Sequence, residues 1–149
     1  MNILIDYFVF SSKVHSIDDL IVLLGLEELE FTEIRSYYGY TNCIYYNGIK
    51  IHYGGREDIC IDLSGKGCRT VENINVDNGF SWFKIIEYLE EYIISKEVHF
   101  SRLDIACDDR SGALDYDKIV KYCKSKKYVC RSKQIRWIDG NEQAVYFGS

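Results

Sequence analysis

The chain has 149 residues, the size of one ordinary domain, and 47% of them are hydrophobic, so it can fill a core. This composition excludes a disordered protein. There is no apolar run of about 18 residues, and Met1–Asp6 lacks the basic and apolar regions of a secretory signal. We therefore expect one domain, residues 1–149, in the cytoplasm and with no membrane contact.

The six cysteines and three histidines form neither a CxxC pair nor a spaced metal box, which argues against a zinc site. The net charge of −5 hides a strong asymmetry. Nine basic and three acidic residues lie between Arg110 and Asn141, a net charge of +6, so the remainder carries −11. Such segregation is more informative about partners than the net charge, because a local basic surface attracts polyanions.

The first third of the chain predicts a strand, a helix and a meander. Ile3–Phe10 is rich in β-branched and aromatic residues, which favours a central strand. Ser16 precedes two acids and an apolar helical stripe, a typical helix start. From Phe31 to Leu63 we expect three or four antiparallel strands, with a hairpin turn at Asn47-Gly48.

The stretch Ser64–Arg69, SGKGCR, allows two interpretations. It is either a tight turn after a strand or a loop in which Lys66 and Arg69 hold a phosphate, although it lacks the full Walker pattern. The next segment, Ser81–Ser95, has one apolar and one charged face at helical spacing. We expect it to be a helix that packs on the core and carries no chemistry.

Val98–Asp109 alternates and predicts a strand with two distinct faces. One face, suited to a core, carries His99, Leu103, Ile105 and Cys107. The other carries Arg102, Asp104, Ala106 and Asp108.

Beyond this strand we expect a short helix capped by Asp115 and β segments at Tyr128–Arg131, Gln134–Ile138 and Ala144–Phe147. The order of elements predicts an α+β fold with a mostly antiparallel sheet and helices packed on it. Sheets of this kind can offer an open face to nucleic acid.

The acids of the alternating strand have two interpretations that the sequence leaves open. Asp104 and Asp108 lie about 13 Å apart on a straight strand, so a shared metal needs a bend or a second strand, with Asp6 as a candidate partner. Oxygen ligands of this kind favour Mg²⁺ or Mn²⁺. Alternatively, Arg102 and Asp104 form an ion pair on a half-exposed face.

The basic segment between residues 118 and 136 is either a solvated helix face or a DNA-binding surface with interleaved aromatic rings. Its candidate DNA-binding residues are Lys118, Lys121, Lys124, Lys126, Lys127, Arg131, Lys133 and Arg136. A tyrosine can attack a phosphodiester, but the thirteen tyrosines of this chain are better explained by packing.

Four blocks stand in one order: Ile5-Asp6-Tyr7, Ser64–Arg69 with Glu72, Arg102–Asp109, and Tyr146–Ser149. Together they resemble the N-terminal part of the replication initiation factor family, which includes rolling-circle plasmid initiators and relaxases of conjugative transposons. The resemblance implies a fold similar to that of HUH endonucleases. It also implies metal-dependent nicking of one DNA strand at an origin hairpin by a tyrosine that becomes covalently joined to the 5′ phosphate.

Carried over by position, the resemblance makes Asp104 and Asp108 the first candidates for metal-related acids, followed by Asp6 and Glu72, with Mg²⁺ or Mn²⁺ as the ion. Lys66, Arg69 and Arg102 join the basic segment as candidate DNA contacts. A homodimer and a host helicase are further partners that the resemblance implies.

In the family, the YFGS block is followed by a segment in which we expect the nicking tyrosine, whereas this sequence stops at Ser149. We therefore expect a truncated initiator that binds DNA and metal without nicking. Two alternatives stay open: a non-catalytic single-stranded nucleic-acid-binding module, and a protein-interaction domain of a mobile element. Loss of Mn²⁺ binding on Asp104→Ala would separate the initiator from the first, and salt-sensitive DNA binding would separate it from the second.

Overall fold

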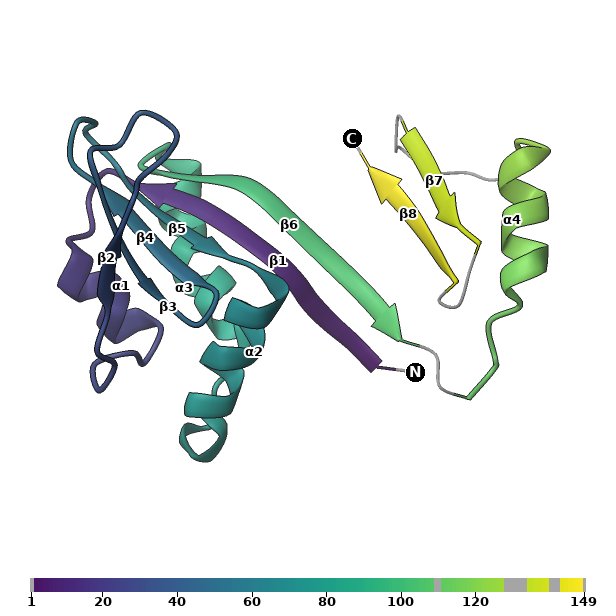
Figure 1. Cartoon of the computed structure of the whole chain (residues 1–149), viewed down its shortest axis with the longest axis horizontal. Helices are drawn as coiled ribbons and strands as arrows, with labels where there is room; N and C mark the ends of the chain where they lie inside the picture. The colour runs from purple at the N-terminus through teal and green to yellow at the C-terminus, as the bar shows by residue number, and fades with distance from the viewer. Residues whose placement is uncertain (1, 109–110, 128–133, 140–142, 149) are drawn as a thin grey trace. The chain divides into compact units, whose positions relative to one another are not determined.

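The structure, a computed structural model, describes residues 2–108, 111–127, 134–139 and 143–148 (Figure 1). The chain forms two compact units, one of residues 3–106 and one of the remaining residues. In neither unit do the described residues form a helix that is long and apolar enough to cross a lipid bilayer.

The larger unit is built on a six-stranded sheet with the strand order β2-β3-β4-β5-β1-β6. The strands are β1 (Asn2–Ser12), β2 (Thr32–Ile34), β3 (Asn42–Tyr46), β4 (Ile49–Tyr53), β5 (Ile59–Leu63) and β6 (Val98–Asp108). The pairs from β2 to β1 are antiparallel, and β6 runs beside β1 in the opposite direction (Figure 1). The turn between β3 and β4 is the predicted Asn47-Gly48 hairpin, in which both residues have positive φ.

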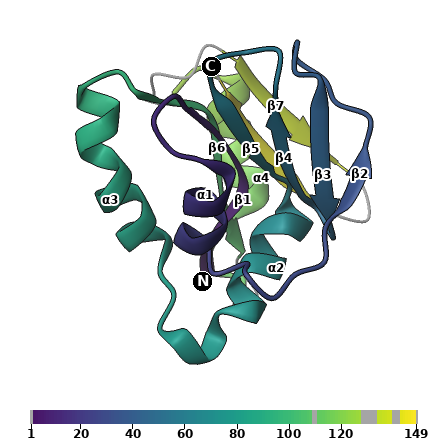
Figure 2. The same cartoon turned by 90° about the vertical axis from the view of Figure 1, so that its left-hand side faces the viewer.

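Three α-helices cover one face of this sheet (Figure 2). They are α1 (Ile17–Leu23), α2 (Gly65–Ile74) and α3 (Trp82–Ile94), with a 3₁₀ turn, η1 (Val76–Asn78), between the last two. The core lies between the helices and the sheet, where Phe8 and Leu63 meet Leu20, Val71 and Leu89, all of them fully buried. The predicted α+β fold with a mostly antiparallel sheet is therefore confirmed.

The smaller unit contains α4 (Tyr116–Lys124) and a hairpin of β7 (Gln134–Ile138) and β8 (Ala144–Gly148). Asp115 caps α4 as expected, because its carboxylate accepts a hydrogen bond from the Lys118 amide at 2.9 Å. The strand predicted for Tyr128–Arg131 lies outside the described residues.

The interpretation of Ser64–Arg69 as a turn or a phosphate loop is wrong, because helix α2 begins there. Ser64 is its N-cap and accepts a hydrogen bond from the Gly67 amide at 3.3 Å. Two glycines in a first turn disfavour a helix by intrinsic propensity. Close packing against neighbouring backbone explains them: a Cβ on Gly67 would lie 2.2 Å from the Gly48 carbonyl oxygen.

The prediction that His99, Leu103, Ile105 and Cys107 form the core face of β6 is also wrong. Val98 and Phe100 reach the core, with the Phe100 ring 5.0 Å from that of Phe8, whereas Ile105 is 65% exposed. Arg102, two residues beyond Phe100, contacts Tyr7 at a hollow on the opposite face of the sheet, so the simple alternation of β6 shifts between Phe100 and Arg102. β6 is also an edge strand, so it has a neighbouring strand, β1, on one side only.

Candidate functional site

The face of the six-stranded sheet that the helices leave uncovered carries polar and aromatic side chains, and we call it the open face. Residues opposite each other in an antiparallel pair share a face. Val9, Asp62 and Lys50 form one such row, and Ser11, Cys60 and His52 form the next. The helix-facing rows between them are apolar. The alternation of side chains along β1, β4 and β5 therefore directs apolar residues to the core and the other residues to the open face.

A hollow of about 360 Å³ lies in the open face, between β1, β5 and β6 and the loop residues Tyr38, Tyr40, Arg56 and Asp58. Its walls include the rings of Tyr7, Tyr38 and Tyr40 and the guanidinium groups of Arg56 and Arg102. Flat rings, cations and carboxylates thus converge on one concave surface, the usual form of a ligand site.

Arg102 is held flat on a tyrosine at the rim of this hollow. Its guanidinium carbon lies 3.9 Å from the centre of the Tyr7 ring, a cation–π contact. Asp104 accepts hydrogen bonds from Arg102 Nε at 3.0 Å and from Nη2 at 2.5 Å, and this pairing raises the pKa of Arg102. The structure thus shows the ion pair that the sequence left open, and the pair fixes the plane of the guanidinium.

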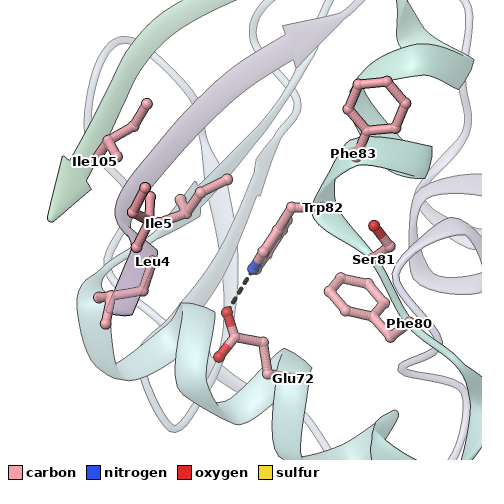
Figure 3. Close-up of a pocket in the computed structure, with 9 residues that line it drawn as sticks. Leu4, Ile5, Glu72, Phe80, Ser81, Trp82, Phe83 and Ile105 are labelled. Atoms are coloured by element: carbon pink, nitrogen blue, oxygen red, sulfur yellow. Dashed lines mark hydrogen bonds between the residues drawn. The ribbon is translucent and has the colours of Figure 1, made fainter. Parts of the chain in front are cut away.

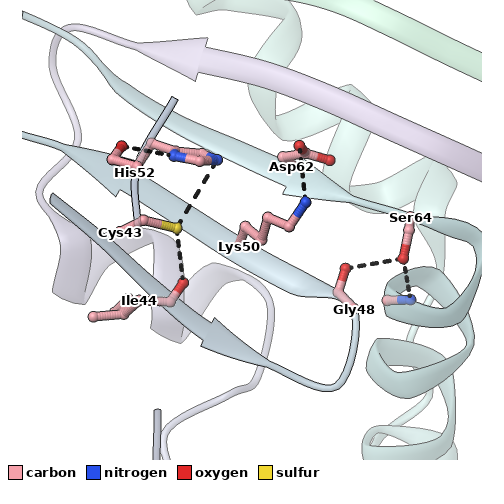
Figure 4. Close-up of polar contacts among 9 residues, drawn as sticks. Cys43, Ile44, Gly48, Lys50, His52, Asp62 and Ser64 are labelled. Carbon is pink, nitrogen blue, oxygen red and sulfur yellow. Dashed lines mark hydrogen bonds and ion pairs between the residues drawn. The ribbon is translucent and has the colours of Figure 1, made fainter. Parts of the chain in front are cut away.

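Asp62 on β5 is a buried carboxylate that sequence reasoning did not select. The residue is 3% exposed, its Oδ2 lies 3.9 Å from Lys50 Nζ (Figure 4), and its Oδ1 has no hydrogen-bond partner among the described residues. Burial and the neighbouring Asp62 carboxylate raise the pKa of Tyr7 to about 12, so Tyr7 stays protonated at neutral pH. The available signal was an acid within the apolar run Ile59–Leu63.

His52 on β4 belongs to a second polar group on the open face (Figure 4). Its Nδ1 lies 3.0 Å from Ser36 Oγ and its Nε2 lies 3.9 Å from Cys43 Sγ. The Tyr38 and Tyr40 rings lie about 6 Å from the imidazole. Burial lowers the pKa of His52, so the imidazole is neutral at physiological pH.

Arg56 and Asp58 close the far side of the hollow. Arg56 Nε donates to Asp58 Oδ1 at 2.9 Å, and the guanidinium lies 5.0 Å from the centre of the Tyr40 ring. Pairing with Arg56 lowers the pKa of Asp58. Asp58 thus has its counter-charge in direct hydrogen-bond contact, whereas Lys50, the counter-charge of Asp62, lies 3.9 Å from Oδ2, and Oδ1 has no hydrogen-bond partner among the described residues.

The four acids predicted as metal-related are not gathered at one point within the larger unit. Asp104 is paired with Arg102 on the open face, whereas Asp6 lies against Gly65 of α2. Glu72 of α2 accepts hydrogen bonds from Arg69 at 2.8 Å and from Trp82 Nε1 at 2.6 Å (Figure 3). Asp108 belongs to the other unit. Among the described residues, no three His, Cys, Asp or Glu side chains are placed to hold one ion.

The candidate DNA-binding residues differ in whether their charged groups are exposed or already bound within the protein. Arg69 Nη2 donates to the Ile5 carbonyl at 2.6 Å and pairs with Glu72, so it ties α2 to β1. Lys66 is exposed at the first turn of α2. In the smaller unit, α4 and the residues after it expose Lys118, Lys121, Lys124, Lys126 and Lys127. Arg136 on β7 is exposed, while Arg131 and Lys133 lie outside the described residues.

An apolar groove of about 460 Å³ lies at the start of α3, away from the open face (Figure 3). It is lined by Ile3–Ile5, Phe80–Phe83, Glu72 and Ile105. Phe83 is 73% exposed there, so the groove presents an apolar side chain to solvent.

These features define an α+β protein whose antiparallel sheet is covered by helices on one face and presents charged and aromatic groups on the other. The chain belongs to the family of rolling-circle replication initiators: residues 2–88 match the family described as the rolling-circle replication initiation protein N-terminal domain. The resemblance found in the sequence is thereby confirmed.

Two relatives extend the match over nearly the whole chain. NicK of Bacillus subtilis strain 168, whose name describes it as a candidate DNA relaxase, is 28% identical over 162 positions, which cover 98% of this chain and 44% of NicK. The solved rolling-circle replication initiator protein of Geobacillus stearothermophilus is 26% identical with a TM-score of 0.70, covering 99% of this chain and 62% of that protein. The chain therefore spans about half the length of these relatives.

Proposed function

We propose that this chain is the DNA-binding part of a rolling-circle initiator or relaxase, and that its open face binds single-stranded DNA at an origin hairpin. Membership of the initiator family supports this, as do the names of the two relatives. The observation that carries the proposal is Arg102, whose guanidinium carbon lies over the Tyr7 ring, 3.9 Å from its centre, at the hollow.

A fixed, partly exposed guanidinium suits unpaired DNA for two reasons. Its charge attracts phosphate, and its plane can stack on a base, which is worth about 1–3 kcal/mol for comparable aromatic platforms. The Arg102 side chain is 53% exposed although Tyr7 covers one side of it and Asp104 binds its edge. The outer side of the plane is therefore accessible to a base.

The basic surface of the smaller unit supports phosphate binding. Lys121 and Lys124 are exposed on α4 and lie beside the buried Val120. Lys124 Nζ also lies 5.5 Å from the centre of the Trp137 ring on β7. Lysines beside an aromatic ring combine phosphate contact with a stacking surface, the pattern of single-strand binders.

We also propose that the full-length protein nicks the origin with a tyrosine beyond Ser149, assisted by Mg²⁺ or Mn²⁺. Asp104 is the first candidate for a metal-related acid in this portion, and the family resemblance supports it. Homodimer formation and a helicase partner stay predictions. A non-catalytic single-strand-binding module stays the second candidate, because the described residues offer a stacking surface without three converging metal ligands.

The first test is binding of a labelled DNA hairpin with a single-stranded flank, measured by fluorescence anisotropy. Arg102→Lys keeps the charge but removes the planar group. We expect it to weaken binding by about tenfold, the equivalent of one lost stacking contact. Arg35→Lys, an exposed arginine that does not line the hollow, is the matched control and should bind like the wild type. Equal affinity of Arg102→Lys and wild type would contradict the proposal.

The same DNA, end-labelled and incubated with Mn²⁺, tests the enzymatic part on a sequencing gel. We expect binding without strand cleavage, because the nucleophile is expected beyond Ser149. Cleavage by this chain would place a nucleophilic residue within the 149 residues. A loss of Mn²⁺ binding on Asp104→Ala would favour the initiator over the non-catalytic module.

A further inference from the structure

We propose that the hollow in the open face holds one unpaired nucleobase and that Asp62 selects a base with an exocyclic amino group. This inference rests on the proposed function, because it names what the open face reads in a bound strand. It would make the hollow a specificity site in addition to a stacking surface.

The first step is the free acceptor at the bottom of the hollow. Asp62 lines the hollow and is only 3% exposed; the Tyr7 hydroxyl interacts with its carboxylate and Lys50 lies near Oδ2, but Oδ1 has no hydrogen-bond partner among the described residues. A buried carboxylate oxygen without a donor is costly, so such a position is expected to acquire a donor from a ligand. Asp58, the other acid of the lining, already pairs with Arg56 at 2.9 Å.

The second step is the flat surfaces beside that oxygen. Arg102 lies at the hollow, and Tyr38 is 69% exposed with its ring inclined at 71° to the His52 imidazole. Tyr38 also has φ +59°, a backbone conformation that costs free energy in a tyrosine and positions this ring at the hollow. Bases that leave a stack are commonly bound between aromatic rings and arginine planes.

The third step is the chemistry of the ligand. The hollow of about 360 Å³ falls within the size range of small-ligand sites, which is about 300–1,000 Å³. Lys50 Nζ already lies 3.9 Å from Asp62 Oδ2 and offsets the carboxylate charge, so a neutral donor suits the remaining oxygen of Asp62. Carboxylates accept hydrogen bonds from the amino groups of bases, and thymine has no such group. We therefore expect cytosine, adenine and guanine, which carry an exocyclic amino group, to be preferred over thymine, whose single donor is its N3–H.

The experiment compares homopolymers of about 20 nucleotides, dC, dA and dT, which exceed the site size of single-strand-binding folds. The full chain is titrated by fluorescence anisotropy as wild type, Asp62→Asn and Tyr38→Leu. Asp77→Asn and Tyr88→Leu are the matched controls, because both residues are exposed and lie outside the hollow. Circular dichroism checks that each variant is folded.

For the wild type we expect dC and dA to bind about fivefold more tightly than dT, the value of one hydrogen bond. Asp62→Asn should reduce this ratio to nearly one, because the amide replaces an acceptor with a donor. Tyr38→Leu should weaken all three homopolymers, and the controls should match the wild type. Equal binding of dC, dA and dT by the wild type, or a ratio that Asp62→Asn leaves unchanged, overturns the inference.

The two proposals fail in distinguishable ways. If the wild type binds every homopolymer with a strong dependence on salt but without base preference, the open face binds DNA and the base site is wrong. If the wild type binds none of them at low salt, the proposed function is wrong as well.

Discussion

At the scale of single residues, His52 shows how the open face is partly closed to water. The residue is fully buried although it lies on the face that the helices leave uncovered, because the segment that contains Ser36, Tyr38 and Tyr40 covers it. Its ring nitrogens find Ser36 and Cys43 as partners. Burial without a paired carboxylate lowers the pKa of the imidazole, since the cation would lose its hydration.

This lowered pKa predicts a pH dependence of stability. The unfolded chain binds a proton at His52 near pH 6.5, whereas the folded chain binds it only at lower pH. Stability contributed by neutral His52 is therefore present above pH 6.5 and falls as the pH drops toward the folded-state pKa. Denaturant unfolding between about pH 7.5 and 5 should show this loss, and His52→Gln should reduce the slope.

The exposed histidine of β6 gives the control for this measurement. His99→Gln should keep the wild-type dependence of unfolding free energy on pH, because His99 is exposed. If His52→Gln and His99→Gln have the same pH dependence as the wild type, the titration of His52 does not couple to folding.

At the scale of elements, the first turn of α2 is locked to the hairpin between β3 and β4. Ser64 Oγ donates to the Gly48 carbonyl at 3.1 Å, and Thr70 Oγ1 donates to the Asn47 carbonyl at 3.0 Å (Figure 4 shows the Ser64 contact). This close approach leaves no room for a side chain at Gly67. The glycine-rich sequence is thus explained by backbone packing.

Gly67→Ala should therefore destabilise the chain. Its new Cβ would lie 2.2 Å from the Gly48 carbonyl oxygen and 3.2 Å from the Ile49 amide nitrogen, so backbone must move. We expect a loss of about 1–3 kcal/mol in the free energy of unfolding, the usual cost of overpacking. Lys66→Ala, one residue earlier and exposed, is the control and should change stability little. A Gly67→Ala variant as stable as the wild type would refute the packing explanation.

At the scale of the whole molecule, charge is distributed unevenly along the chain. The net charge is −5, but residues 110–141 carry +6. Their described lysines are exposed on and after α4, so the positive charge is at the surface of the smaller unit. The open face, in contrast, pairs most of its charges internally, as in Arg102–Asp104 and Arg56–Asp58. We therefore expect α4 to supply phosphate contacts and the open face to bind bases.

This division predicts which residues control the salt dependence of the affinity for DNA. Replacing both Lys121 and Lys124 with glutamine should flatten the plot of log affinity against log salt by about 0.7 per lysine for single-stranded DNA. The double variant should still prefer dC and dA over dT. The matched control, Lys13→Gln with Lys84→Gln, removes the same charge from exposed positions of the larger unit and should keep the wild-type slope. Equal slopes for both double variants would exclude α4 as a phosphate-binding element.

The sequence alone determined the elements whose signals are local. The helix start at Ser16, the Asn47-Gly48 turn and the apolar stripe of Ser81–Ser95 each depend on neighbours in the chain, and the structure confirms all three. The α+β class and the family followed from their order and from the four sequence blocks. The Arg102–Asp104 pair was also foreseen as one of two alternatives, because residues two apart on a strand share a face.

Only the tertiary structure decided the features that depend on distant segments. Helix α2 replaced the expected turn because Gly67 packs on a hairpin some twenty residues earlier, a contact that propensity does not contain. Asp62 emerged as a site residue because β1, β5 and β6 are brought together around it, leaving one oxygen without a donor. The core face of β6 changed because an edge strand with a shifted alternation buries Phe100 and exposes Ile105. In each case the deciding free energy comes from contacts between segments that are far apart in the chain.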